Sequence, residues 1–154
     1  MKLVVQKVHK CKLYVENEKI SEINDGLLVF VGVHKNDDSS CVEYLARKIS
    51  QMRLFKDEND KLNRSVLDIN GDILVVSNFT LMAEIASGTR PSFSNGADFE
   101  KANALYLSLA DEFRKNGTKN VQIGKFRSHM HLETTLDGPF TIVIERNGKN
   151  EQNK

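Results

Sequence analysis

The sequence predicts an α+β domain in which a mainly antiparallel, barrel-like sheet is accompanied by two amphipathic helices. Three observations lead to this fold class. Short apolar runs are separated by turn signals, two segments have helical periodicity, and the elements follow the order strands, helix, strands, helix, strands. A doubly wound dinucleotide-binding fold would instead alternate strand and helix regularly. The 154 residues contain no repeat or dividing linker, so one domain is expected over residues 1–146.

The first part of the chain is expected to be β-structure. Strands are predicted over residues 2–8, 12–16 and 19–23, where β-forming apolar residues recur. Asn24-Asp25-Gly26 is a turn signal. The run that follows, residues 27–33, is apolar throughout, which indicates a strand buried on both faces.

Two amphipathic helices are predicted from the spacing of apolar residues. The first covers about residues 40–53 and follows the capping cluster Asp37-Asp38-Ser39-Ser40. The second begins near Asp98 and is stopped by Gly117. The apolar positions at helical spacing are Val42, Leu45, Ile49 and Met52 in the first helix, and Phe99, Ala102, Leu105, Tyr106, Leu109 and Phe113 in the second.

The rest of the chain is expected to hold strands, turns and a polar tail. These segments are an extended piece at 54–55, a charged turn at 56–61, a hairpin of 66–69 with 73–81, a loop at 83–96, strands at 121–135 and 140–146, and a C-terminal tail at 147–154.

Composition excludes several function classes. A net charge of +1 does not suit a general nucleic-acid coat or a membrane-surface protein, so a nucleic-acid substrate would have to be gripped locally. No apolar run approaches the roughly 20 residues that span a bilayer, and the first residues do not resemble a signal peptide. Cys11 and Cys41 are expected to be free thiols. We therefore expect a cytoplasmic protein without a membrane partner.

The motifs of common cofactor and nucleophile sites do not occur. The sequence has no P-loop, no Rossmann glycine pattern and no G-x-S-x-G elbow. His129 and His131 would share one face of an extended strand, but no third ligand lies nearby, so they are interpreted as strand-surface residues and no metal is expected. No cofactor is predicted.

The segment Ser77-Asn78-Phe79-Thr80-Leu81 lies where an apolar strand ends. If the strand continued, Ser77 and Phe79 would share one face. Thr80 lacks an adjacent base, so a role as an ordinary β-forming residue is favoured over a role as nucleophile. The segment can nevertheless offer main-chain N–H groups, which are able to stabilise an oxyanion.

The segment Gly138-Pro139-Phe140-Thr141 interrupts a strand-like stretch near the C-terminus. Proline cannot donate to a strand ladder, and a preceding glycine permits backbone angles closed to other residues. A cis bond is worth considering here. Such a dipeptide can present free carbonyl oxygens.

Taken together, these segments resemble the D-aminoacyl-tRNA deacylase family over about residues 1–146. Ser77 to Leu81 resembles the family's Ser-Gln-Phe-Thr-Leu motif, and Gly138 to Thr141 resembles its Gly-Pro-Val-Thr motif. Other matching segments, in the same order along the chain, are Val5-Gln6-Lys7-Val8, Arg90-Pro91-Ser92-Phe93, and Gly124-Lys125-Phe126 followed by Met130.

The resemblance implies a homodimeric hydrolase that cleaves the ester joining a D-amino acid, or glycine, to the terminal adenosine of tRNA. It implies that a cis Gly138-Pro139 enters the other subunit's site and excludes L side chains. The catalytic segment implied is Ser77, Asn78, Phe79 and Thr80, with the N–H groups of Phe79 and Thr80 near the scissile carbonyl. The ribose 2′-hydroxyl of the tRNA assists in the family.

The same resemblance implies contacts with the terminal nucleotide. Phe126 and Met130 are expected to hold the adenine through an apolar face. Basic residues on expected loops are candidates for phosphate contacts, although solvated surface charge is the alternative for any single one. Among Arg64, Arg90, Lys125 and Arg127, the favoured residue is Arg90, because it precedes Pro91 in a matching motif.

Four positions depart from the family pattern. Asn78 replaces a glutamine and Lys7 stands in place of an arginine, which removes a planar bidentate contact to the Gly-Pro segment. Leu136 replaces an asparagine and Phe140 a valine. We expect weaker discrimination of L from D substrates than in a typical family member. The alternative function is a binding module on the same fold with a weakened site.

Overall fold

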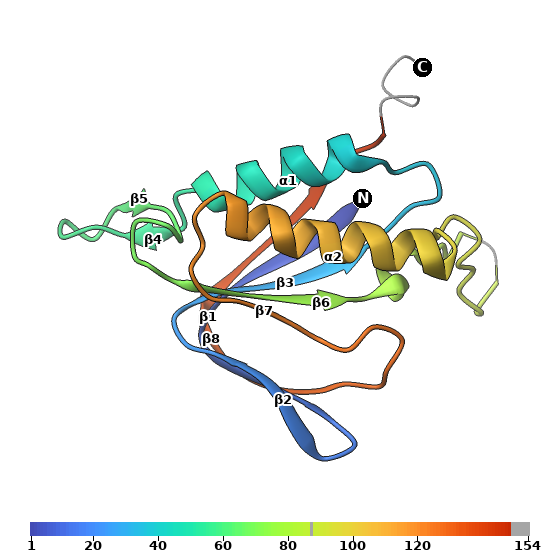
Figure 1. Cartoon of the computed structure of the whole chain (residues 1–154), viewed down its shortest axis with the longest axis horizontal. Helices are drawn as coiled ribbons and strands as arrows, with labels where there is room; N and C mark the ends of the chain where they lie inside the picture. Colours follow the sequence, from blue (N-terminus) through green and yellow to red (C-terminus); the bar gives the residue numbers. More distant parts are fainter. Residues whose placement is uncertain (87, 149–154) are drawn as a thin grey trace.

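The computed structural model describes residues 1–86 and 88–148, and its centre is one strongly curved, six-stranded sheet (Figure 1). The strand order is β2-β1-β3-β6-β7, and β8 pairs with the other edge of β1. A separate two-stranded sheet joins β4 and β5. The bounds are β1 Lys2–Val15, β2 Glu18–Ile23, β3 Gly26–Gly32, β4 Phe55–Lys56, β5 Leu62–Arg64, β6 Asp72–Ser77, β7 Val121–Ile123 and β8 His131–Glu145.

The long strand β1 organises the sheet. Its first half pairs antiparallel with β3 and its second half with β2, while β8 runs antiparallel along nearly its whole length. The pairs β3–β6 and β6–β7 are parallel. The predicted α+β class with a barrel-like sheet and two helices is confirmed, and the sheet is mixed because three neighbouring strands run in the same direction.

Both helices pack on the same side of the sheet and against each other (Figure 1). Helix α1 covers Ser39–Gln51 and helix α2 covers Phe99–Lys115. The capping predicted for α1 is confirmed, because the Asp38 side chain accepts a hydrogen bond from the N–H group of Ser40 at 2.9 Å. Asp98 caps α2 in the same way, by accepting from the N–H group of Lys101 at 2.9 Å. The larger core lies beneath them and includes Leu45, Ile49, Val75, Leu109 and Phe113.

A second, smaller core fills the opposite side of the sheet. It contains Val8, Leu13, Leu28 and Leu74, whereas Val29 belongs to the larger core. Successive residues of β3 therefore enter different cores, which confirms that this strand is buried on both faces. Full burial of each such side chain stabilises the fold by about 1.5–3 kcal/mol.

The predicted hairpin of 66–69 with 73–81 is wrong. Residues 66–70 form a turn, in which Gly71 N–H donates to the Val66 carbonyl at 2.8 Å. The Asp68 carboxylate accepts from the N–H and hydroxyl of Ser65, and this local bonding competes with a strand ladder. Strand β6 instead pairs with β3 and ends at Ser77, where a 3₁₀ helix, η1 (Phe79–Met82), begins.

The strand predicted at 121–135 also differs from the structure. Strand β7 ends at Ile123 and β8 begins at His131, with a loop over 124–130. The break predicted between 135 and 140 is absent, because β8 continues through Gly138-Pro139 in a bulge. Of the expected tail 147–154, Gly148 is buried, and residues 149–154 lie outside the described part.

The start of β1 and the end of β8 are joined through Met1. The Met1 ammonium is buried and bonded to the Asp37 carboxylate, and it also donates to the Arg146 carbonyl at 2.6 Å. In the part of the chain that the structure describes, no helix is long and apolar enough to cross a membrane.

Candidate functional site

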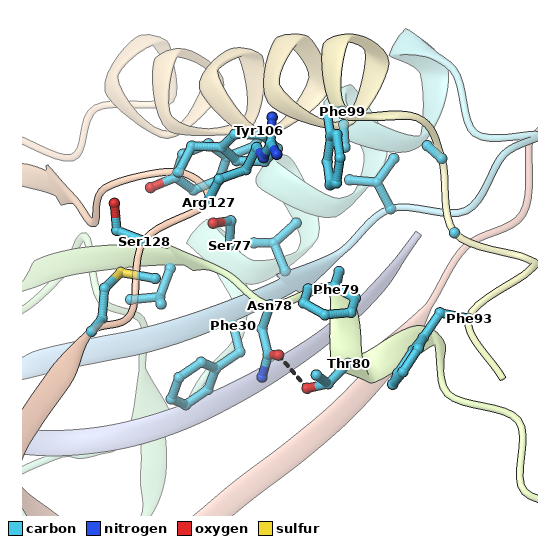
Figure 2. Close-up of a pocket in the computed structure, with 18 of the residues that line it drawn as sticks. Phe30, Ser77, Asn78, Phe79, Thr80, Phe93, Phe99, Tyr106, Arg127 and Ser128 are labelled. Carbon is cyan, nitrogen blue, oxygen red and sulfur yellow. Dashed lines mark hydrogen bonds between the residues drawn. The ribbon is translucent and has the colours of Figure 1, made fainter. Parts of the chain in front are cut away.

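A pocket of about 780 Å³ lies where β6 ends, between η1, the start of α2 and the loop before β8 (Figure 2). Six residues expected to belong to a site line it: Ser77, Asn78, Phe79, Thr80, Phe126 and Met130. Four of these residues precede α2 in the sequence and two follow it, so the fold brings together segments about 50 residues apart. The parallel pairing of β3, β6 and β7 makes this possible, because their C-terminal ends meet at one edge.

The turn out of β6 fixes the side chains of Asn78 and Thr80. Asn78 N–H continues the ladder by donating to the Val31 carbonyl at 2.8 Å. The Thr80 hydroxyl donates to the Asn78 side-chain oxygen (Figure 2). Because η1 replaces the expected strand, the prediction that Ser77 and Phe79 share a strand face is wrong. The threonine hydroxyl is engaged with an amide and not with a base.

The N–H groups of Phe79 and Thr80 are available at the pocket. A helix leaves its first N–H groups without partners inside the helix. Elsewhere in residues 1–86 and 88–148, no acceptor is found for these two groups. Two neighbouring main-chain donors therefore remain free in a mostly apolar pocket, where they can bind a carbonyl oxygen or an oxyanion.

Aromatic side chains form the walls of the pocket. Phe79 is 64% exposed and meets Phe93 edge-on, with ring centroids 5.0 Å apart. On the other side Tyr106 stacks with Phe126 at 6.0 Å. Such surfaces suit a planar, apolar ligand such as a nucleobase.

Gly124 allows Met130 to approach this wall. A Cβ atom at position 124 would lie 2.7 Å from the Met130 Sδ, closer than van der Waals contact permits. The main chain of Gly124 is held on both sides, because its N–H donates to the Val75 carbonyl at 2.9 Å and its carbonyl accepts from the Tyr106 hydroxyl at 3.3 Å. The matching Gly124-Lys125-Phe126 segment is thus a close-packed wall of the pocket.

Tyr106 was predicted only as an apolar position of α2, and its place in the pocket was missed. Its hydroxyl also donates to the Val75 carbonyl at 3.0 Å, and burial raises its pKa to about 12. The phenol is therefore neutral at physiological pH and serves to tie α2 to β6. Helical periodicity marks this residue as buried but cannot distinguish a core position from a pocket wall.

The pocket carries little charge. Its described lining contains no carboxylate and one arginine, Arg127, whose guanidinium lies over the Phe99 ring with 3.8 Å from Cζ to the centroid. His129 is also part of the lining. General acid–base catalysis by a carboxylate is therefore not supported by this pocket.

Lys7, Gly138 and Pro139 lie together, outside the lining of this pocket. The Gly138-Pro139 bond is cis, as expected. Strand β8 bulges there, since Gln6 faces Thr141 and Val8 faces Leu136. The Lys7 Nζ pairs with the Asp137 carboxylate at 2.8 Å, so a single contact from lysine holds the bulge next to Gly138. This bond is the largest cause of a lowered Asp137 pKa.

Arg90 lies on the exposed loop between η1 and α2 and does not line the pocket. The neighbouring residue Ser92 is fixed by two main-chain bonds to Glu84, at 2.8 and 2.9 Å. Phe93 of the same segment does reach the pocket. Among the described residues no group of His, Cys, Asp and Glu could hold a metal ion. Cys11 and Cys41 are buried free thiols whose pKa is raised by burial.

Comparison with known proteins gives one consistent family. The family model described as D-Tyr-tRNA(Tyr) deacylase matches residues 4–145. A D-aminoacyl-tRNA deacylase of Thermotoga petrophila is 48% identical over 94% of this chain and 97% of the relative. One of Clostridioides difficile is 46% identical with the same shares covered.

Two solved structures have the same fold. The c-Myc DNA Unwinding Element Binding Protein has a TM-score of 0.90 at 35% identity, over 96% of this chain and 100% of the other. A probable eukaryotic D-amino acid tRNA deacylase has a TM-score of 0.79 at 15% identity, over 93% and 97% of the two chains. The second likeness concerns the fold alone.

Proposed function

This chain belongs to the D-Tyr-tRNA(Tyr) deacylase family and is a hydrolase of D-aminoacyl-tRNA, and we propose that the pocket at the end of β6 is where it cleaves the ester. The observation that carries this proposal is the pair of free N–H groups at Phe79 and Thr80. Both residues line a pocket that has aromatic walls and whose described lining contains no carboxylate. Glycine esterified to the wrong tRNA is a second substrate in this proposal.

The proposed mechanism uses main-chain donors for the reacting carbonyl. The ester carbonyl oxygen accepts hydrogen bonds from the Phe79 and Thr80 N–H groups, which strengthen as negative charge develops on that oxygen. Phe126 and Met130 hold the terminal adenine, with Tyr106 behind them. Water attacks the ester carbonyl with assistance from the 2′-hydroxyl of the substrate ribose, since the described pocket lining offers no carboxylate base. The bond from the carbonyl carbon to the ribose 3′-oxygen then breaks, and this oxygen takes a proton that comes from the water, which releases the free amino acid and the tRNA. Ser77 and Asn78 shape the turn that presents the donors.

The proposal includes a homodimer in which Gly138-Pro139 enters the partner's pocket. Its support is that this dipeptide does not line the pocket of its own chain. Within residues 1–86 and 88–148, strand β8 pairs with β1 on one edge and with no other strand, and it exposes Leu136 at 44% and Val143 at 61%. A long edge strand with exposed apolar side chains is suited to association with a second chain. The glycyl and prolyl carbonyl oxygens would then exclude an L side chain.

Two further parts of the proposal concern the setting of the enzyme. A cytoplasmic location follows from a substrate made and used in translation. Arg90, on the exposed loop beside Phe93, is proposed to contact the tRNA outside the pocket. The alternative of a module that only binds RNA or a partner is not favoured, because the relatives of Thermotoga petrophila and Clostridioides difficile, aligned over nearly the whole chain, are named deacylases.

Release of free amino acid tests the activity directly. The purified protein is incubated with D-Tyr-tRNA, and in a second reaction with glycine charged on a non-cognate tRNA. We expect release of D-tyrosine and glycine well above the rate without protein. Phe126→Ala should raise KM for both substrates, because it removes the aromatic member of the pair, Phe126 and Met130, that holds the adenine in this proposal. Stable binding of D-Tyr-tRNA without any release would support the binding module instead.

A further inference from the structure

The guanidinium of Arg127 occupies an unusual position at the mouth of the pocket. Arg127 belongs to the loop over 124–130 and has φ +59°, in the left-handed region that favours glycine. Its neighbours Phe126 and Ser128 also line the pocket. Figure 2 shows the Arg127 side chain extending toward α2, where its guanidinium lies over the Phe99 ring.

One face of this guanidinium is covered and its edges are free. The Cζ lies 3.8 Å from the centroid of the Phe99 ring, at the first residue of α2. Stacking on an aromatic ring fixes the plane of a guanidinium while leaving its five N–H groups directed outward. A fixed plane with outward donors matches the geometry of a phosphate.

No carboxylate neutralises Arg127. Across residues 1–86 and 88–148, no Asp or Glu lies within salt-bridge distance of its guanidinium, whereas Arg64 pairs with Glu58 at 2.8 Å and Arg114 with Asp111 at 2.7 Å. The described pocket lining contains no carboxylate either. In a chain with a net charge of only +1, this pocket mouth is a local cationic site.

We propose that Arg127 binds the phosphate on the 5′ side of the terminal adenosine of the substrate tRNA. This inference rests on the proposed function, because it needs that adenosine to be held by Phe126 and Met130. The adenosine itself is uncharged, so the phosphate is the only anion of the terminal nucleotide. Arg127 would set the register of the RNA end, so that the ester reaches the N–H groups of Phe79 and Thr80.

A packing role for Arg127 is the main alternative, in which it only supports Phe99 or stacks on the base. Two small substrates distinguish these roles. One is adenosine esterified at its 3′-hydroxyl with D-tyrosine, and the other is the same ester carrying a 5′-phosphate. A packing role affects both esters equally, whereas a phosphate contact affects only the second.

The test compares kcat/KM for the two esters in the wild type and in Arg127→Gly, a variant whose new residue suits the φ of +59°. We expect the wild type to prefer the phosphorylated ester by about tenfold, as one charge-assisted contact allows. Arg127→Gly should lose this preference, so that its kcat/KM values for the two esters become equal. Arg127→Lys should retain part of it. Equal preference in wild type and Arg127→Gly overturns the proposal.

A second readout uses full-length D-Tyr-tRNA. The negative slope of log kcat/KM against log salt concentration should become less steep by about 0.7 in Arg127→Gly, the contribution of one phosphate in a single strand. The matched control is Arg47→Gln, an exposed arginine of α1 that does not line the pocket, and its slope should equal that of the wild type. An unchanged slope in Arg127→Gly contradicts the phosphate contact. Wild-type protein without any activity on D-Tyr-tRNA would instead refute the proposed function itself.

Discussion

At the scale of single residues, two hydroxyl groups of the site are already engaged within the protein. The Thr80 hydroxyl bonds to Asn78, and the Tyr106 hydroxyl bonds to two carbonyls. Within the described residues the main-chain N–H groups of Phe79 and Thr80 have no acceptor, so they can bind a substrate carbonyl. Sequence motifs identify such a segment by resemblance, but residue chemistry alone cannot, because every residue has an N–H group.

Thr80→Ala tests whether the hydroxyl takes part in the chemistry. The substitution removes the bond to Asn78 and leaves the main-chain N–H in place, so we expect kcat/KM for D-Tyr-tRNA to fall by less than about tenfold. Thr80→Ser, which keeps a hydroxyl, should resemble the wild type. A loss of about a thousandfold or more in Thr80→Ala, with an unchanged circular dichroism spectrum, would make the hydroxyl a catalytic group.

The Lys7–Asp137 pair makes a prediction about acid stability. Because the Lys7 bond lowers the Asp137 pKa in the folded protein, the carboxylate adds stability above its unfolded pKa of about 3.9, and this stability is lost as pH falls through the folded pKa. Asp137→Asn should therefore have a lower Tm than wild type at pH 7. The difference in Tm should shrink as the pH falls below about 4, the unfolded pKa of the carboxyl. A difference independent of pH would show that the pair does not stabilise the bulge.

At the scale of elements, local sequence signals predicted the helices, whereas the ends of the strands depend on how the strands pair. Asp38 and Asp98 cap the two helices, and the spacing of their apolar residues is sufficient to locate both. The end of β6 could not be read in the same way. Residues 78–81 have the composition of a strand, but the pairing of β6 with β3 ends at Val31↔Ser77 and the chain turns into η1.

The loop between β7 and β8 shows the same limit. A continuous strand over 121–135 fits the residue types, yet the loop over 124–130 is what places Phe126 and Met130 in the pocket. The close approach of Met130 to Gly124 depends on tertiary packing that no local pattern reveals. The resemblance of Gly124-Lys125-Phe126 followed by Met130 to the family motif indicated Phe126 and Met130. Arg127 was one of several loop cations considered for phosphate contacts, and no sequence feature favoured it over the others.

Gly124→Ala tests the packing of this wall. The added methyl would lie 2.7 Å from the Met130 Sδ and 3.2 Å from the Leu13 Cδ1, so the flexible methionine must move within the pocket. We expect KM for D-Tyr-tRNA to rise by about threefold to thirtyfold, with a smaller change in kcat. Steady-state kinetics with a melting curve checks this. An unaltered KM would show that Met130 does not contact the substrate.

At the scale of the whole molecule, the proposed exclusion of L side chains requires two chains. The pocket and the Gly138-Pro139 bulge lie on different parts of one chain, and neither the resemblance nor the fold brings them together within it. The sequence alone does not mark this strand for association, because an apolar run such as Ile142-Val143-Ile144 is equally typical of a strand buried within one chain. The structure exposes Leu136 and Val143 on the strand that has one free edge.

Val143→Asp tests the proposed dimer. A carboxylate at this exposed position of β8 would be buried without a partner in the interface, so we expect a monomer in sedimentation velocity. The control is Leu107→Asp on α2, where the side chain is also exposed, at 41%, and the dimer should persist. The monomer should retain the fold and lose preference for D over L substrates. A dimeric Val143→Asp would place the interface elsewhere.

The central claim is tested most directly by the hydrolysis of D-Tyr-tRNA and L-Tyr-tRNA in parallel by wild-type protein and by Pro139→Ala. We predict that the wild type releases D-tyrosine faster than L-tyrosine by about a hundredfold or more, although less selectively than relatives with arginine at position 7. Pro139→Ala should lower the ratio of the D-tyrosine release rate to the L-tyrosine release rate. Equal release of both enantiomers by the wild type would contradict the claim that a carbonyl barrier from the partner chain guards a main-chain oxyanion site.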